Sequence, residues 1–437
     1  MMNTERLNSS RRQFLKHSAA LAGVTLMGDL AHGASSLSTV DDIITIALVG
    51  CGSRGAGAAV NALRADKQVR LVALADAFPD KISETLSTLL RIPDVKDAVQ
   101  VTEANCFSGF EGYLKAIAQA DVVLLATPPA FRPMHFAAAV EAGKHVFMEK
   151  PLASDAPGIR QVLEAGKQAK QKNLKVSVGL QNRYDPAFIE WVERLQNGEL
   201  GELVSATDYY LIGPVKHVDR LPGQTEMEYQ MRNWRYFNWL WAGSPAGLQI
   251  HNTDVVNWVK GSYPVRAQGM GGRSGNYAPG YGDIFDHFFI EYEYADGMKL
   301  NSQIRSVMGT WNRGGATFIG TKGKADAAVK NITDLHGNEQ WRSAAKGNAY
   351  QLQHDQFFAA IREDKPMNDT EWAAMSTLTT LLGRMAVHSG KMVQWDEAFH
   401  SELSILPETF SWDALPPSLP DRNGHYPLPI PGQAEIL

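Results

Sequence analysis

The stretch "IALVGCGSRGAG", residues 46–57, decides the fold. It begins with the end of a short apolar run that is typical of a buried strand, and the glycines that follow are spaced G-x-G-x-x-G. Such glycines allow a tight turn, a close approach to a pyrophosphate and close packing of the next helix, whose N-terminus faces the phosphates. We therefore predict a dinucleotide-binding loop with these cofactor contacts: Gly50, Gly52, Ser53, Arg54 and Gly55.

An acidic residue ends the next apolar run, "VRLVALAD" (69–76). Asp76 follows Gly50 by 26 residues, and a carboxylate at that place accepts hydrogen bonds from the adenosine ribose. Because it would repel a 2′-phosphate, NAD is the predicted cofactor. Arg54 and Lys81 are able to bind such a phosphate, so NADP stays open as the alternative.

The remaining pattern predicts two domains in a chain of 437 residues. Apolar runs alternate with helical segments up to about residue 175, as in a parallel sheet covered by helices, whereas longer alternating runs after residue 200 predict a mostly antiparallel sheet. The fold class is thus α/β, with an N-terminal Rossmann domain and a C-terminal α+β domain that has a large open sheet. The predicted segments are a signal (1–34), a linker (35–42), the Rossmann domain (43–175), the substrate and oligomerisation domain (176–405) and an extended arm (406–437).

The N-terminus is predicted to be an export signal. Residues 10–16, "SRRQFLK", resemble the twin-arginine signal, and the apolar run from Ser18 to Ala31 is too short and too rich in glycine and alanine to span a membrane. Cleavage near Ala34 predicts a periplasmic protein, although His32 fits the cleavage pattern badly and leaves a retained anchor open. The signal makes the twin-arginine translocation machinery, which moves folded proteins, a predicted partner.

The net charge and the cysteine content limit the classes of ligand that the protein is expected to bind. The net charge of −5 argues against binding nucleic acid or an anionic membrane surface. Cys51 and Cys106 lack the spacing of a metal site, and the low cysteine count agrees with folding before export. We predict no metal site.

The segment "ATPPAFRPMHFAAAVEAGKHVFMEKPLA" (126–153) resembles the glucose-fructose oxidoreductase/inositol dehydrogenase (Gfo/Idh/MocA) family. Together with the glycine loop, "GLQNR" (179–183) and "HNTDVVNW" (251–258), the resemblance covers residues 43–395. It implies cofactor contacts from Thr127, Pro128, Glu149 and Lys150. It also implies that Lys150 contacts the substrate, where an ammonium group stabilises developing charge on oxygen or relays a proton.

The second catalytic segment of the family corresponds to residues 239–258 here. His251 matches the catalytic histidine, and Asp254, one helical turn later, matches its partner. The inositol dehydrogenase-like members place an aspartate four residues before the histidine, but this chain has Gly247 there. His217, Asp219 and His287 are candidates to replace that acid from other loops, but nothing in the sequence shows that they do.

Sugars are bound by planar polar side chains and stacked aromatic rings, and the segment "NWRYFNWLW" (233–241) is rich in both. The aromatic residues of this segment are as readily explained as core or subunit contacts. The predicted substrate-binding residues are Arg183, Tyr209, Arg235, Asn252, His287 and Arg313.

These observations predict an exported NAD-dependent oxidoreductase that acts on a sugar, glycoside or polyol by hydride transfer. Its cofactor is expected to stay tightly bound and to be recycled within the site, because no NAD pool exists outside the cytoplasm. A glycoside hydrolase or lyase that oxidises a sugar hydroxyl transiently is the alternative, and a non-catalytic sugar-binding protein is the third. The open sheet implied by the family predicts a homo-oligomer.

Overall fold

The computed structural model describes residues 42–275 and 277–435. The predicted signal and linker, 1–34 and 35–42, lie outside these residues except for Asp42. No helix within the described part of the chain is long and apolar enough to cross a membrane.

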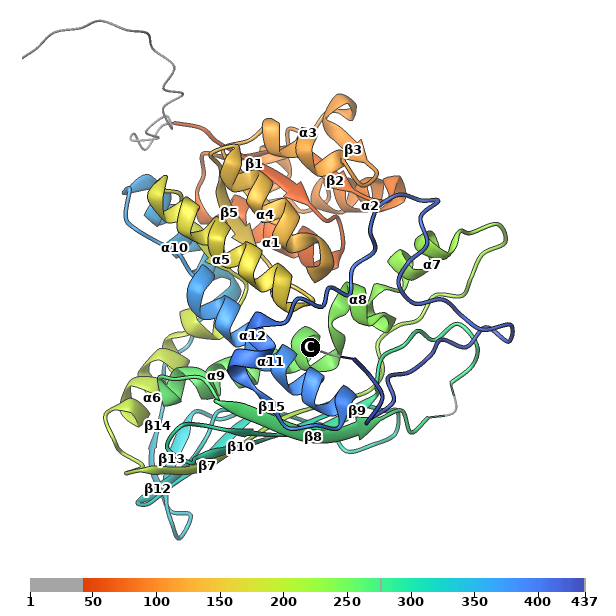
Figure 1. Ribbon diagram of the computed structural model, residues 1–437. Helices are drawn as coiled ribbons and strands as arrows, with labels where there is room; N and C mark the ends of the chain where they lie inside the picture. Colours follow the sequence, from red (N-terminus) through yellow and green to blue (C-terminus); the bar gives the residue numbers. More distant parts are fainter. Residues whose placement is uncertain (1–41, 276, 436–437) are drawn as a thin grey trace, which may run out of the picture. The chain divides into compact units, whose positions relative to one another are not determined.

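The first sheet has six parallel strands in the order β3-β2-β1-β4-β5-β6, which confirms the Rossmann domain (Figure 1). Its strands are β1 (Ile44–Val49), β2 (Val69–Asp76), β3 (Cys106–Ser108), β4 (Val122–Leu125), β5 (His145–Met148) and β6 (Val176–Val178). Its helices are α1 (Ser53–Ala65), α2 (Pro79–Leu89), α3 (Gly112–Ala118), α4 (Arg132–Glu141) and α5 (Ala156–Gln171). The side chains of β4 are all buried, as expected of a strand with helices on both faces.

The Rossmann domain extends beyond the predicted boundary at residue 175. Its sixth strand, β6, follows that boundary, and α10 (Ala349–Arg362) returns from the C-terminal half to pack against α1. Phe357 and Phe358 of α10 belong to the apolar cluster that also contains Ile46 and Leu48 of β1. The Rossmann domain is therefore built from two separate stretches of sequence, and no single position along the chain marks its end.

The second sheet has nine strands in the order β14-β13-β12-β11-β7-β10-β9-β8-β15. Strands β7 and β10 pair in parallel and every other pair is antiparallel, which confirms the predicted open and mostly antiparallel sheet. The strands are β7 (Leu203–Ile212), β8 (Arg266–Gly272), β9 (His287–Glu293), β10 (Lys299–Ser306), β11 (Arg313–Gly320), β12 (Gly323–Asp326), β13 (Asn331–Asp334), β14 (Glu339–Arg342) and β15 (Val393–Gln394).

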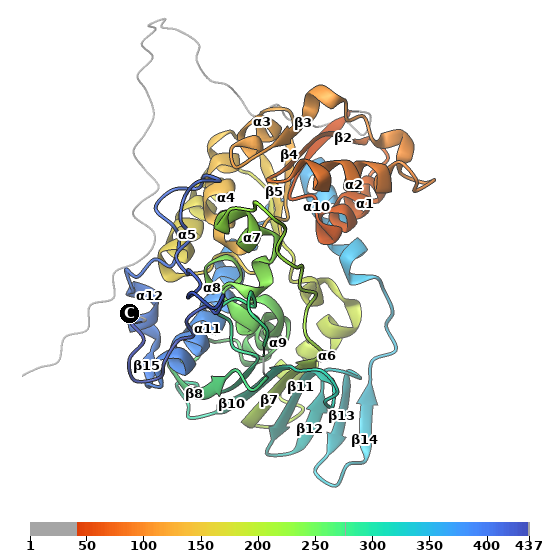
Figure 2. The same ribbon diagram turned by 90° about the vertical axis from the view of Figure 1, so that its right-hand side faces the viewer.

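Helices cover only one face of this sheet. Both α9 (Ile250–Lys260) and α11 (Thr370–Ser389) pack on it, and neither view shows a helix of the described chain on the opposite side (Figures 1 and 2). Along β10, Leu300, Ser302 and Ile304 are buried while the residues between them are partly open. We call the side opposite α9 and α11 the uncovered face. The helices α6 (Pro186–Gln196) and α12 (Trp395–His400) complete this half.

Residues 213–249 and the tail, residues 401–435, connect the two halves. The first contains α7 (Glu226–Arg232) and α8 (Asn238–Trp241), whereas the tail forms no helix or strand. Phe410 and Trp412 of the tail pack on aromatic rings of the Rossmann domain. Ring centroids lie 5.2 Å apart for Trp412 and Phe78, 4.6 Å for Trp412 and Phe110, and 4.9 Å for Phe410 and Phe131. Short 3-10 turns span Lys96–Ala98, Glu103–Asn105, Pro129–Phe131, Gln181–Tyr184 and Trp234–Tyr236.

Candidate active site

A cavity of about 870 Å³ lies at the carboxyl ends of the Rossmann strands, where doubly wound sheets bind their ligands. Its walls are the glycine loop, the ends of β2 and β4, and residues of the 216–235 segment. Phe78, Phe110 and Phe131 also line it, so the aromatic rings that hold the tail are part of its wall. The cavity is thus enclosed by both halves of the chain.

The glycine loop fits a dinucleotide. Gly50 has φ +102°, and a Cβ there would come within 2.6 Å of the backbone of Ala126. A Cβ on Gly55 would lie 2.0 Å from the Gly50 carbonyl oxygen, whereas one on Gly52 would meet nothing within 4 Å. The first and last glycines therefore let the turn close, and the middle one leaves space beside the start of α1. No side chain caps that helix, so its first amides are available to a pyrophosphate.

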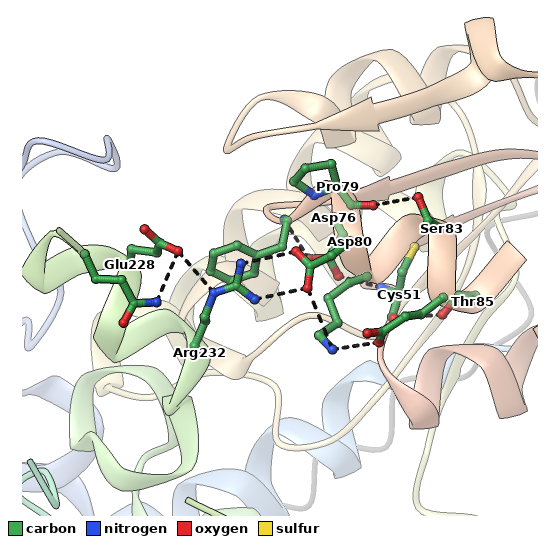
Figure 3. Close-up of polar contacts among 12 residues, drawn as sticks. Cys51, Asp76, Pro79, Asp80, Ser83, Thr85, Glu228 and Arg232 are labelled. Atoms are coloured by element: carbon green, nitrogen blue, oxygen red, sulfur yellow. Dashed lines mark hydrogen bonds and ion pairs between the residues drawn. The ribbon is translucent and has the colours of Figure 1, made fainter. Parts of the chain in front are cut away.

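Asp76 lies at the end of β2, beside the loop. Its carboxylate accepts hydrogen bonds from the backbone amides of Cys51 (2.7 Å) and Phe78 (3.0 Å) (Figure 3). Burial raises its pKa above the ordinary value. A carboxylate has about four lone-pair sites, so two remain for ribose hydroxyls.

The adenosine end of the cavity is bridged by an ion pair. Arg232 of α7 donates to both carboxylate oxygens of Asp80 on α2 (3.1 and 3.2 Å) and to Glu228 (3.1 Å) (Figure 3). Its guanidinium carbon also lies 4.0 Å from the ring centroid of Phe78. We call these contacts the Arg232 bridge, and it joins the C-terminal half to the Rossmann domain beside Asp76.

Lys150 follows β5, and its ammonium group donates to the backbone carbonyl of Gly247 at 2.9 Å. Its pKa is lowered to about 8, chiefly by burial; the nearby cations Arg235 and Arg54 contribute to this shift, and Glu149 opposes it. Glu149 accepts a hydrogen bond from Nε of Arg54 at 2.5 Å. The glycine loop and the predicted catalytic lysine are therefore joined by one ion pair.

Thr127 and Pro128 follow β4 and line the same cavity. The buried Arg132 donates to the carbonyl of Thr127 at 2.5 Å, and the ring of His135 lies 3.3 Å from the threonine hydroxyl. These contacts fix the backbone on the side of the cavity opposite α1.

His251 lies in the first turn of α9 and is half-buried. Burial, together with the charges of Lys150 and Arg54, lowers its pKa well below the ordinary value. Its Nδ1 is buried and has no hydrogen-bond partner among residues 42–275 and 277–435. The imidazole is therefore neutral near pH 7.

Asp254 does not orient His251 as the sequence suggested. Both of its oxygens accept hydrogen bonds from Arg183 (3.0 and 2.9 Å), and one also accepts from Ser376 at 2.6 Å. Arg183 lies against the rings of Trp258 (5.1 Å) and Trp372 (4.1 Å). The buried aspartate and the partly exposed arginine thus form a bidentate pair that holds α9, and neither takes the role predicted for it.

A tryptophan fills the place of the missing acid. A Cβ on Gly247 would lie 2.0 Å from Nε1 and 2.1 Å from Cε2 of Trp241. Gly247 belongs to a π-helical turn, Pro245–Gln249, which leads directly into α9. Of the groups proposed as replacements, His217 is bonded to Tyr229 (3.0 Å) and His287 to Asp286 (2.7 Å). The indole of Trp241 therefore takes the space that an acidic side chain would need.

Three predicted substrate-binding residues lie on the uncovered face. Side chains alternate along a strand, and Asp208 of β7 accepts a hydrogen bond from Thr253 on α9 at 2.9 Å. Tyr209 therefore points the other way, with Arg313 4.3 Å above its ring. His287 points to the opposite face of the sheet from its neighbour Phe288, which is buried beside His388 of α11. Tyr209, His287 and Arg313 are thus separated from Lys150 by the sheet.

Of the remaining two, Asn252 binds the backbone carbonyl of Tyr209 at 2.8 Å, and Arg235 lines the cavity. Two tyrosines near Arg235 and Arg54 were not predicted from the sequence. Tyr210 lies on the covered face, one residue from the predicted Tyr209, and Arg235 and Tyr350 are near enough to influence its pKa. Tyr350 comes from α10 and stacks beneath Arg54 at 4.6 Å. The strand alternation could have identified Tyr210, whereas no local signal identifies Tyr350.

No group of three metal-ligating side chains gathers in the described chain.

The comparisons with known proteins agree with the geometry. The family's sequence model for an oxidoreductase NAD-binding Rossmann fold matches residues 44–180, and its model for the C-terminal alpha/beta domain matches residues 192–394. The chain belongs to the Gfo/Idh/MocA family of oxidoreductases.

Two similar family members are inositol dehydrogenases. Inositol 2-dehydrogenase of Rhizobium meliloti is 26% identical over 225 residues, which is 51% of this chain and 56% of that protein. The scyllo-inositol 2-dehydrogenase (NAD(+)) of Bacillus subtilis is 25% identical over 205 residues, 46% of this chain and 54% of that protein. The matched region thus spans about half the length of these relatives.

Solved structures share the fold. The aldose-aldose oxidoreductase from Caulobacter crescentus has a TM-score of 0.62 at 18% identity, covering 81% of this chain and 100% of that one. Levoglucosan dehydrogenase in complex with NADH and levoglucosan has a TM-score of 0.62 at 16% identity, covering 81% and 99%. The Rossmann half of this Gfo/Idh/MocA protein is an NAD-binding domain.

Proposed function

We propose that this protein is an exported NAD-dependent oxidoreductase that oxidises a hydroxyl group of a sugar, glycoside or polyol. The observation that carries the proposal is the position of Lys150. Its ammonium group is fixed on the Gly247 carbonyl and is joined through Glu149 and Arg54 to the dinucleotide loop. A proton-handling group is thus placed beside the cavity that fits the cofactor.

The bound NAD supplies the acceptor for the hydride that leaves the carbon bearing the hydroxyl group. His251, which is neutral near pH 7 and lies close enough to Lys150 for that charge to lower its pKa, is the proposed acceptor of the hydroxyl proton. Lys150 uses one of its three N–H bonds on Gly247 and directs the others to the oxygen as negative charge develops there. Asp254 and Arg183 hold the helix that carries His251 and do not touch the proton.

We propose further that the cofactor is retained. The Arg232 bridge lies at the adenosine end of the cavity, and Phe410 and Trp412 pack on three aromatic residues of its wall. Release of a dinucleotide would require these contacts to separate. Retention allows internal recycling, in which a second sugar carbonyl takes up the hydride and a proton and leaves as the alcohol.

Export to the periplasm by the twin-arginine route remains a proposal from residues 10–16. Assembly into a homo-oligomer is proposed for the uncovered face, which exposes Met270, Phe289 and Ile319. Met270 and Phe289 are directly opposed across β8 and β9. An exposed apolar patch of this kind favours a protein partner.

The test begins with protein purified without added cofactor. Denaturation should release NAD, and addition of sugars to the native protein should change the nicotinamide absorbance and yield a ketone. Lys150→Met should keep the dinucleotide but lose turnover, while Lys322→Gln, an exposed cation on the turn before β12, should behave as the wild type. Release of an aglycone without net NADH would favour the hydrolase or lyase alternative. Sugar binding by a protein that holds no dinucleotide would overturn the proposal.

A further inference from the structure

Positive charge predominates around Lys150. Lys150, Arg54 and Arg235 lie near enough to one another to influence the lysine's pKa. The acids close by are already paired, because Glu149 binds Arg54 and Asp254 binds Arg183. Gly247, whose carbonyl binds Lys150, carries no side chain and so adds no acid there. The site therefore presents more hydrogen-bond donors and positive charge than a neutral sugar requires.

Arg235 is held in place without an acidic partner. Its guanidinium carbon lies 4.9 Å from the ring centroid of Trp234, and that ring meets Trp241 edge-on at 6.4 Å. Trp241 in turn packs on Gly247, whose carbonyl binds Lys150. This chain of contacts fixes the guanidinium group relative to the reacting centre.

The contrast with Arg232, one turn earlier, is informative. Arg232 is bound to Asp80 and Glu228, whereas no carboxylate of residues 42–275 and 277–435 lies within 4.0 Å of Arg235. Arg235 and Lys216 are both exposed, and both line the cavity. Like Arg235, Lys216 has no ion pair in the described chain. Two cations thus face the cavity with their charge unmatched by the protein.

We infer that the substrate is a sugar acid whose carboxylate is bound by Arg235. The inference rests on the proposed function and names its substrate class. A planar guanidinium donates two parallel hydrogen bonds to a carboxylate, and the stacked Trp234 orients it for such a pair. The pyrophosphate of the cofactor has its own binding place at the first amides of α1.

The test measures sugar binding to the dinucleotide-loaded protein by calorimetry. The probes are three matched sets: glucose, glucuronate and glucose 6-phosphate, the corresponding galactose compounds, and the corresponding mannose compounds. At least one uronate should bind at least 10-fold more tightly than its neutral parent. Arg235→Gln should weaken uronate binding about 10- to 100-fold, as expected for the loss of a charged hydrogen-bond pair, and should weaken the binding of the neutral parent sugars much less.

Arg235→Lys should restore part of the affinity because it keeps the charge but not the two parallel bonds. Lys322→Gln removes an exposed cation elsewhere and serves as the matched control. The inference is overturned if no uronate binds, if neutral sugars or phosphates bind best, or if Arg235→Gln loses the dinucleotide instead of the uronate. Uronate binding without any change in nicotinamide absorbance would refute the proposed oxidoreductase but uphold the carboxylate site.

Discussion

Gly247→Ala should destabilise the protein by crowding one tryptophan. The new methyl group would lie 2.0 Å from Nε1 of Trp241, so the indole must retreat by about 1.4 Å to reach ordinary contact at 3.4 Å. Trp241 is only 3% exposed and is held edge-on by Trp234, which leaves it little room. Overpacking of this kind costs about 1–3 kcal/mol of the free energy of unfolding.

The measurement is thermal unfolding of four proteins: the wild type, Gly247→Ala, Trp241→Phe and the double variant. With an unfolding entropy that scales with chain length, the predicted loss lowers the Tm of Gly247→Ala by about 1–4 °C. The smaller phenyl ring of Trp241→Phe should make the alanine less costly, so the two changes should not be additive. Gly314→Ala is the control, because a Cβ there meets nothing within 4 Å.

The reasoning is refuted if Gly247→Ala melts with the wild type, or if Trp241→Phe does not reduce the cost of the alanine. The same variants distinguish a loss of stability from a loss of turnover. If the displaced indole also moves the Gly247 carbonyl, the anchor of Lys150 at 2.9 Å is lost and turnover falls further than stability. Turnover that is unchanged in a destabilised Gly247→Ala would show that the anchor survives.

Three further results are expected. Because burial lowers the pKa of Lys150 to about 8, kcat/KM should decline above pH 8 as the ammonium loses its charge, and a pH profile of the wild type with no such limb would contradict the assigned role. Asp254→Asn should cost about 3 kcal/mol of unfolding free energy, the lower end for a buried pair because Arg183 is partly exposed, and a denaturant titration that shows no loss would argue against a structural pair. Replacing Phe410 and Trp412 together by alanine should speed loss of the dinucleotide on dialysis by about 10-fold or more, whereas an unchanged half-life would show that the tail does not retain it.

The sequence predicted the fold well because its signals are local. The spacing of Gly50, Gly52 and Gly55 and the acid at Asp76 are read within one β-α-β unit, and all four residues lie where the loop requires them. The alternating runs after residue 200 likewise became the nine-stranded sheet. The family resemblance predicted that Lys150 contacts the cofactor, and in the structure its neighbour Glu149 is bonded to Arg54 of the glycine loop, a contact that spacing alone does not reveal.

The site was harder to predict because its details depend on packing between distant segments. The aromatic pattern indicated Tyr209, but it is Tyr210 that lies on the covered face, since one residue of register reverses the face of a strand. The i, i+3 spacing of His251 and Asp254 suggested a pair, but Arg183 competes successfully for the carboxylate. Tyr350 reaches Arg54 from almost three hundred residues away, so only the folded chain reveals it.

The position of the tail has a consequence for synthesis. The Rossmann domain is complete only when α10 has left the ribosome, and fifty residues separate Arg362 at its end from Trp412. At about 5–20 residues per second this interval lasts roughly 2.5–10 s. In that time the cavity has its N-terminal wall but not the aromatic rings that later cover the edge of that wall. A cofactor bound during this interval would reflect the nucleotide concentrations of the cell that made the protein. NAD supplied after purification would enter the cavity only if the tail first moved away from that wall.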